Sequence, residues 1–108
     1  MTDRELLERA AHAAYYHYDA DEGLCGTLYV DKFAARQQGW NPLEDDGDAF
    51  RLMVSLELNV FHASGNAYAM PSDFEMDNEQ CVSYRDAGGC EQATRRAIVR
   101  AAAAMVDS

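Results

Sequence analysis

Residues 58–70 read LNVFHASGNAYAM, and this stretch decides the fold class. Leu58 to Ala63 predicts a strand, Ser64-Gly65-Asn66 a turn, and Ala67 to Met70 the returning strand of a hairpin. Pro71 then ends the pairing, because proline lacks the backbone N–H that a ladder needs. Strands joined by so short a turn are antiparallel. The sequence therefore predicts an antiparallel sheet built around this hairpin.

Further strands are predicted on both sides of the hairpin. Tyr16 to Tyr18 and Leu24 to Val30 form an expected pair, separated by the polar, glycine-terminated segment 19–23. Gln80 to Arg85 predicts another strand, with Cys81 or Val82 facing inward. The run Phe33 to Gly39 is compatible with either a helical turn or a loop.

Three helices are predicted around these strands. Thr2 and Glu5 fit a capping box, so the first helix is expected from Asp3 to about Tyr16. The aspartates before Ala49 can cap a second helix, and Glu91 to Val106 forms an alanine-rich third. The expected architecture is α+β: one domain over residues 1–108, with an antiparallel sheet of about four strands covered by three helices in an α/β sandwich.

The expected core takes its bulk from aromatic and aliphatic side chains. Trp40, Phe50 and Tyr29 are expected to be mostly buried, with Tyr15 and Tyr18 nearer the surface. As an alternative, an exposed recognition patch could be formed by Tyr15, Tyr16, Tyr18, Tyr29 and Trp40. The three cysteines are expected to be small core fillers. The second helix is expected to bury a broad face. That face comprises Ala49, Phe50, Leu52, Met53, Val54 and Leu56.

The formal net charge of −10, with a pI near 4.5, bounds the partners. Such a surface repels nucleic acid and anionic membranes and attracts basic surfaces. We therefore expect neither direct nucleic-acid binding nor membrane association. Arg95, Arg96 and Arg100 form a basic cluster. We expect these arginines to solvate a helix face and to interact with the helix C-terminus, rather than to bind nucleic acid.

The acids are concentrated in one part of the chain. Residues 41–80 hold nine acids and one base, Arg51. Asp73, Glu75, Asp77 and Glu79 alternate with other residues, and an extended backbone would align them at intervals of roughly 6.6 Å. Such a row resembles the charge rhythm of a nucleic-acid backbone. The expected partner-binding residues are these four, then Asp45, Asp46 and Asp48, then Asp19, Asp21 and Glu22.

Signatures of catalysis, metal binding or cofactor binding are lacking in the sequence. The glycines are scattered, and Cys25, Cys81 and Cys90 show no zinc-type spacing. The group Asp45, Asp46 and Asp48 could hold a divalent cation, but helix capping explains it with fewer assumptions. We expect no enzyme activity, no cofactor and no metal. From the odd cysteine count and the lack of an apolar leader we expect a cytoplasmic location.

Two segments carry a family resemblance. Residues 40–52, WNPLEDDGDAFRL, and residues 93–102, ATRRAIVRAA, resemble small phage proteins of the ABA sandwich domain family. In those proteins a W-N-P-x-x-D-x-x-x-A segment opens a central helix, and an alanine-rich helix closes the domain. The resemblance implies a phage gene and an α/β sandwich. It supplies no catalytic residues, and the acids of residues 73–79 and the three cysteines depart from the family pattern.

These features lead to three functional hypotheses. In the first, the chain is a phage-encoded, anti-CRISPR-like inhibitor that binds a basic host defence protein, such as a CRISPR effector subunit, at its nucleic-acid-binding surface. The second is a phage accessory protein that binds another host or phage protein through an apolar or mixed surface. The third and least favoured is a metal-dependent enzyme acting on nucleic acid or a nucleotide. Solvated surface charge is the plain alternative for every acid named.

Overall fold

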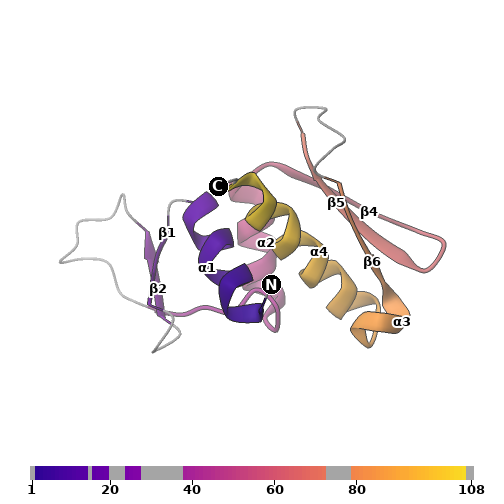
Figure 1. The fold of residues 1–108 in the computed structure, drawn as a ribbon, viewed down its shortest axis with the longest axis horizontal. Helices are drawn as coiled ribbons and strands as arrows, with labels where there is room; N and C mark the ends of the chain where they lie inside the picture. The colour runs from indigo at the N-terminus through magenta and orange to yellow at the C-terminus, as the bar shows by residue number, and fades with distance from the viewer. Residues whose placement is uncertain (1, 15, 20–23, 28–37, 73–78, 107–108) are drawn as a thin grey trace.

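The computed structural model describes residues 2–14, 16–19, 24–27, 38–72 and 79–106 (Figure 1). Within these ranges the chain is α+β, as the sequence predicted. The helices are α1 (Asp3–Ala13), α2 (Asp46–Ser55), α3 (Tyr84–Ala87) and α4 (Cys90–Met105). The strands are β1 (Tyr16–Asp19), β2 (Leu24–Thr27), β3 (Gln38–Gly39), β4 (Leu58–Ala63), β5 (Asn66–Pro71) and β6 (Gln80–Ser83).

The described strands form two antiparallel sheets, ordered β1-β2-β3 and β4-β5-β6. The expected antiparallel sheet of about four strands is therefore met only in part, because each of the two sheets has three described strands. The two sheets separate because β1 and β2 pair only with each other and with β3, on the far side of α1 from β4 to β6 (Figure 1). The predicted pairing of residues 16–18 with the strand that begins at Leu24 is confirmed. Most of the undecided run 33–39 lies outside the described residues.

The predicted hairpin is confirmed, with a tighter turn than expected. Ser64 and Gly65 alone form it, at φ 55° and 78°, and Asn66 already pairs with Ala63 as the first residue of β5. Two central residues with positive φ match the right-handed twist of the flanking strands, which is the geometry preferred in two-residue hairpins. Pro71 is the last residue of β5, opposite Leu58.

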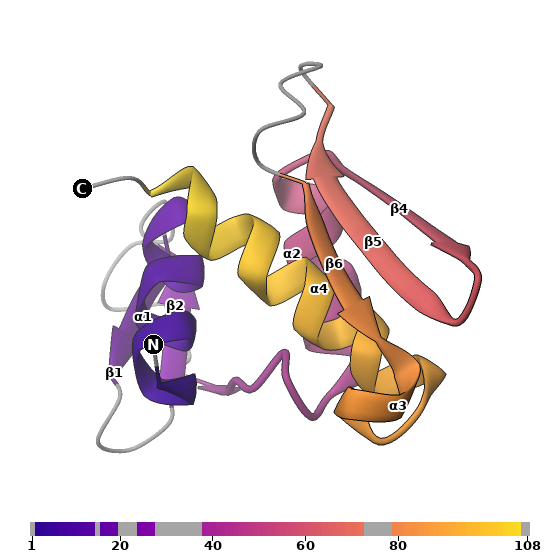
Figure 2. The ribbon, with the colours of Figure 1, turned by 45° about the vertical axis from the view of Figure 1, so that its right-hand side comes forward.

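Helix α4 is the centre of the fold. It lies between α1 on one side and the β4-β5-β6 sheet on the other, and α2 also packs against it (Figure 2). Most of its alanines, together with two alanines of α1 and two of β5, are almost fully buried. Small side chains let the backbones approach closely, because the space between elements shrinks with side-chain size. The buried alanines are Ala10, Ala11, Ala67, Ala69, Ala93, Ala97, Ala101, Ala102 and Ala103.

The boundaries of several elements differ from the predictions. Helix α1 begins at Asp3 after an N-cap at Thr2, whose side chain accepts from the Glu5 N–H, but it ends at Ala13 because Tyr16 is already in β1. Strand β6 ends at Ser83, whose hydroxyl caps the single turn of α3, so Tyr84 and Arg85 are helical. Helix α3 was not predicted, because a helix of a single turn has no apolar periodicity to detect.

The second helix buries a narrower face than the sequence suggested. Ala49 and Leu52 are buried, whereas Phe50 is 60% exposed and Val54 is 56% exposed. Burial follows the spacing 49, 52, 53 and 56, which is one stripe of an α-helix, and residues 50 and 54 lie off that stripe. The expected burial of Phe50 and Val54 is wrong. Trp40 is buried, as predicted. The side chains of Tyr15, Tyr18 and Tyr29 lie outside the described part of the structure.

Candidate partner-binding surface

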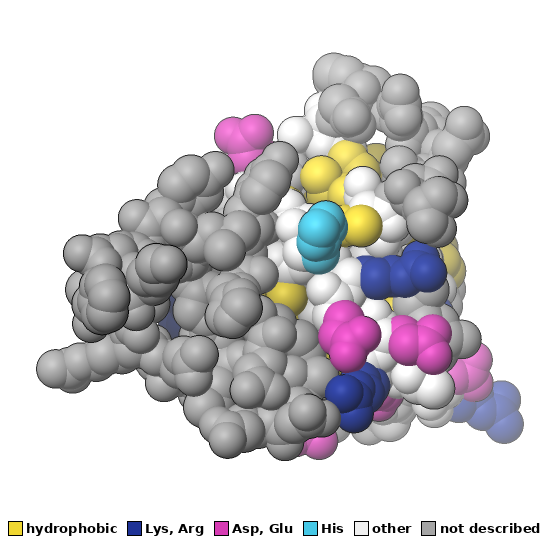
Figure 3. Space-filling view, turned by 60° about the vertical axis from the view of Figure 1, so that its left-hand side comes forward, with side chains coloured by type: hydrophobic (Ala, Val, Ile, Leu, Met, Phe, Trp, Pro, Cys, Tyr) yellow, Lys and Arg dark blue, Asp and Glu magenta, His cyan; other side chains and the backbone are white. Residues whose placement is uncertain are grey.

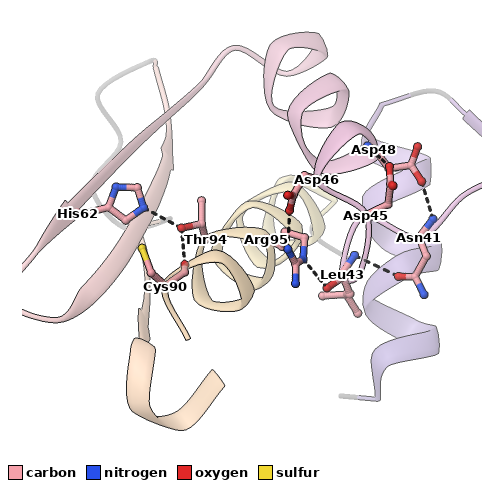
Figure 4. Close-up of polar contacts among 9 residues, drawn as sticks. All are labelled: Asn41, Leu43, Asp45, Asp46, Asp48, His62, Cys90, Thr94 and Arg95. Atoms are coloured by element: carbon pink, nitrogen blue, oxygen red, sulfur yellow. Dashed lines mark hydrogen bonds and ion pairs between the residues drawn. The ribbon is translucent and has the colours of Figure 1, made fainter. Parts of the chain in front are cut away.

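The acidic cluster before Ala49 builds the start of α2. Asp45 is the N-cap, and its carboxylate accepts from the Asp48 N–H at 2.8 Å (Figure 4). Helix starts prefer aspartate because its side chain satisfies an amide that has no partner within the helix, and its charge opposes the positive end of the helix dipole. The capping predicted from the sequence is confirmed. The Asp45 side chain nevertheless remains 60% exposed.

Asp48 has a structural position rather than a surface one. Its residue is only 8% exposed, and its carboxylate accepts from the Asn41 N–H at 2.9 Å and from Arg51 Nη2 at 2.7 Å. The Asn41 side-chain oxygen in turn accepts from the Leu43 N–H at 3.1 Å, which orders the loop that enters the helix. Asp48 therefore offers little carboxylate surface to a partner, although it was predicted as one of the contact residues.

Asp46 connects α2 to α4. Its side chain is 74% exposed and forms an ion pair with Arg95, whose own side chain is only 13% exposed. Arg95 also donates from Nε to the Leu43 carbonyl at 2.9 Å (Figure 4). Arg96, the next residue, instead pairs with Asp3 of α1 at 3.2 Å. The predicted arginine cluster is thus divided: Arg95 contacts the α2 entry loop and Arg96 contacts α1.

Most of the acids of the alternating row lie outside the described residues. This applies to Asp73, Glu75 and Asp77, and likewise to Asp21, Glu22 and the side chain of Asp19. Glu79 is described and half-buried just before β6. The pKa of Tyr68 is raised, mainly by a contact with Cys81. The charge of Glu79 makes a smaller contribution in the same direction. Glu79 directly precedes β6, the strand in which Cys81 is opposite Tyr68.

That outer sheet surface carries an aromatic pair. Phe61 of β4 and Tyr68 of β5 are opposite each other and stack with ring centroids 4.8 Å apart and planes 4° apart. Cys81 of β6 is the next residue in the same row and is exposed. The opposite surface, which carries Ala67, Ala69 and Val82, is buried against α4. Phe61 remains 43% exposed, so this aromatic pair is available to a partner.

The structure also brings together a polar group that sequence spacing did not reveal. His62 Nε2 lies 2.7 Å from Thr94 Oγ1, and the Thr94 hydroxyl donates to the Cys90 carbonyl at 2.7 Å (Figure 4). Because that hydroxyl proton is committed, Thr94 must accept from His62, which places a proton on Nε2. Partial desolvation, and then a contact with Cys90, raises the pKa of Tyr84. The 32 positions between His62 and Thr94 explain why the sequence did not show this group.

The free cysteines are placed differently from the prediction. Cys81 and Cys90 are both exposed, so the expectation that they fill the core is wrong for these two. Cys25 has no described side chain. His62 is also exposed. Within the described ranges, no group of three His, Cys, Asp or Glu side chains is positioned to hold a metal ion.

Charge of both signs is mixed on one face of the described surface. In Figure 3, acidic and basic side chains lie next to one another near a histidine and several hydrophobic side chains. On α1, Arg4 and Glu8 form such a pair at 3.2 Å. A patch of one sign is therefore not found among the described side chains of this face. No described helix is long and apolar enough to cross a membrane.

Comparisons with known proteins found no matching family model, no matching curated protein and no matching solved structure.

Proposed function

We propose that this chain is an acidic binding protein that occupies a basic, nucleic-acid-binding surface of another protein. The observation that carries the proposal is the charge asymmetry: nine acids against one base over residues 41–80, in a chain of net charge −10. A groove that binds nucleic acid already favours polyanions, so an acidic protein gains steered association and peripheral ion pairs there.

The geometry refines which acids are assigned to the contact. Glu44, Asp45 and Asp46 are exposed around the start of α2, and Glu79 precedes β6 beside the Tyr68 row. We assign the contact to these residues and to Asp73, Glu75 and Asp77, with Asp19, Asp21 and Glu22 as a secondary group. Asp48 is left out because its carboxylate is buried and bonded to Asn41 and Arg51.

The narrower form of the proposal is a phage-encoded inhibitor of a host defence protein, comparable to an anti-CRISPR protein. It is supported by the resemblance of residues 40–52 and 93–102 to phage ABA sandwich proteins, together with the charge. Such an inhibitor works in the bacterial cytoplasm and needs no catalytic residue or cofactor, because occupying the nucleic-acid site is sufficient. The expected partner is a CRISPR effector subunit or another basic, nucleic-acid-handling protein.

The experiment begins with affinity capture from the bacterial host and then measures the captured partner with purified components. Neutralising Asp73, Glu75, Asp77 and Glu79 with Asn and Gln should weaken binding about fourfold to several hundredfold, since each exposed ion pair contributes about 0.2 to 1 kcal/mol. The matched control neutralises four exposed acids elsewhere: Glu5, Glu8, Asp86 and Glu91.

The two variants remove the same net charge, so a general charge effect would weaken both equally. The proposal requires the first variant to lose binding, the control to retain most of it, and both to keep the parent melting temperature. Undiminished binding by the first variant would show that the acids of residues 73–79 are not part of the contact.

A second candidate function is favoured by the exposed stack of Phe61 and Tyr68. Aromatic side chains are enriched at the centres of protein interfaces, so this sheet surface could bind a partner through apolar contact. The chain would then be an accessory protein that acts without nucleic-acid mimicry. Substituting Phe61 with Ser would abolish that binding, and rising salt would leave it nearly unchanged.

A further inference from the structure

A cavity of about 360 Å³ lies between α1, α4 and the start of β6. Its polar lining is cationic, from Arg9 of α1 and from Arg96 and Arg100 of α4, with the amide of Gln80 beside them. Its apolar lining comprises Leu6, Ala103, Ala104 and Val106. This volume lies within the range of about 300 to 1,000 Å³ typical of small-molecule sites, which combine apolar walls with a few polar groups.

Among the described arginines, the three that line the cavity are more buried than Arg4, Arg51 and Arg85. Arg9, Arg96 and Arg100 are all half-buried, whereas Arg4 and Arg51 have side chains 62% and 66% exposed. Arg95 is more buried still, but its guanidinium is held by Asp46 and the Leu43 carbonyl. A guanidinium group presents several N–H donors in a fixed plane, which an anionic partner can satisfy in pairs.

A carboxylate partner is found for only one of the three arginines that line the cavity, within the described residues. Arg96 pairs with Asp3 at 3.2 Å, but within the described part of the chain neither Arg9 nor Arg100 has a carboxylate partner. Arg96 and Arg100 are also one helical turn apart, a spacing at which like charges destabilise a helix by about 0.2 to 0.5 kcal/mol. In a protein with 19 acids and 9 bases, three arginines around one cavity form an exceptional positive site.

The helix dipole does not explain these arginines. The dipole effect falls off within the last turn of a helix, and α4 has no basic residue in its last turn. The interpretation of Arg96 and Arg100 as partners of the helix C-terminus, drawn from the sequence, is therefore wrong. Both also line a neighbouring cavity of about 360 Å³, together with Ser83 and Asp86.

We propose that the cavity lined by Arg9, Arg96 and Arg100 binds the phosphate group of a small phosphomonoester. Guanidinium groups bind phosphate oxygens through paired N–H donors, and a phosphate dianion accommodates more than one such group. Gln80 adds a neutral donor. The wall formed by Leu6, Ala103 and Ala104 accepts an apolar part of the same molecule. This site is independent of the acidic surface proposed above, and its ligand has the opposite charge to the proposed protein partner.

The test measures thermal unfolding and calorimetric binding with three probes: inorganic phosphate, adenosine monophosphate, and adenosine without phosphate. Chloride holds the ionic strength constant. A ligand at ten times its Kd should raise the melting temperature by about 5 °C in a domain of this size. We expect saturable stabilisation by both phosphate-containing probes, with the nucleotide binding more tightly, and none by adenosine.

The variant Arg9→Gln/Arg100→Gln should lose this stabilisation. The matched control is Arg4→Gln/Arg85→Gln, which removes the same charge from two exposed positions and should respond like the parent. The comparison also separates binding from the general stabilising effect of phosphate salts, which would be equal in all three proteins. If the double variant does not fold, Arg9→Gln alone must weaken calorimetric binding of phosphate at least tenfold.

Equal stabilisation of the parent and the Arg9→Gln/Arg100→Gln variant would overturn the proposal. So would the absence of saturable phosphate binding to the parent, or stabilisation by adenosine as strong as that by the nucleotide.

Discussion

Arg95 and Leu43 are joined across 52 positions of the chain by a hydrogen bond from Nε to the backbone carbonyl, 2.9 Å long. Because the same guanidinium pairs with Asp46, one side chain of α4 holds both the entry loop and the first turn of α2. Residues 40–52 and 93–102 are thereby in contact: Leu43 and Asp46 lie in the first segment and Arg95 in the second.

This relationship makes Arg95 a stability determinant. Replacing Arg95 with Ala should lower the free energy of unfolding by about 2 kcal/mol, because hydrogen bonds to charged groups contribute about 1.5 to 3 kcal/mol. Chemical denaturation measures the change. Arg85→Ala, on the exposed surface of α3, serves as the control and should cost less than about 0.5 kcal/mol. Equal losses in the two variants would contradict the bridging role.

Asp48 should matter more for folding than any other described acid at the start of α2. Asp48→Ala leaves the Asn41 N–H without its acceptor, so we expect a loss of about 2 to 3 kcal/mol in unfolding free energy. Asp48→Asn should lose less, since an amide oxygen can still accept from Asn41. Glu44→Ala is the exposed control and should be nearly neutral. A neutral Asp48→Ala variant would mean that its carboxylate is free for a partner.

The alanine packing around α4 should tolerate no added volume. Ala101 is fully buried, and Ala101→Leu should destabilise the fold by about 3 kcal/mol or more, since overpacking a dense core forces neighbouring side chains and backbone to shift. Ala104, three residues later, is half-buried, and Ala104→Leu should cost much less. Thermal unfolding of the two variants distinguishes close helix packing from simple alanine helix propensity, which would affect both positions alike.

The contact with Cys81 raises the pKa of Tyr68 above its ordinary value of 10.0. A raised pKa in the folded state means that the neutral phenol is favoured there, so its contribution to stability is complete below pH 10 and is lost as pH rises through the folded-state pKa. Cys81→Ala should lower the pKa of Tyr68. An NMR titration of the Tyr68 ring measures this shift, and an unchanged pKa would refute the assigned cause.

The sequence predicted the helices that have strong caps or long apolar patterns. Thr2, Asp45 and the alanine run of α4 are local signals, and each marks an element that the structure contains. The hairpin of β4 and β5 was equally readable because Ser64-Gly65 is a short turn between two apolar strands. These features depend on neighbouring residues alone, which is why one sequence reveals them.

Features that depend on tertiary contact were not predictable. Phe50 is as apolar as a core residue, but its exposure depends on the direction from which α4 approaches α2. The division into two sheets depends on the position of α1, which lies between β1-β2 and the β4-β5-β6 sheet (Figure 1). His62 meets Thr94, and Arg9 joins Arg96 and Arg100, only after α4 packs against its neighbours. The acids of residues 73–77 stay a prediction, because they lie outside the described residues.

The most direct test of the central claim is the affinity of the captured partner at about 50 and 200 mM salt, with and without DNA as a competitor. The account predicts that binding weakens roughly tenfold or more with salt and that DNA displaces the chain from its partner. Affinity that is unchanged by salt, with DNA and the chain bound to the partner together, would contradict it.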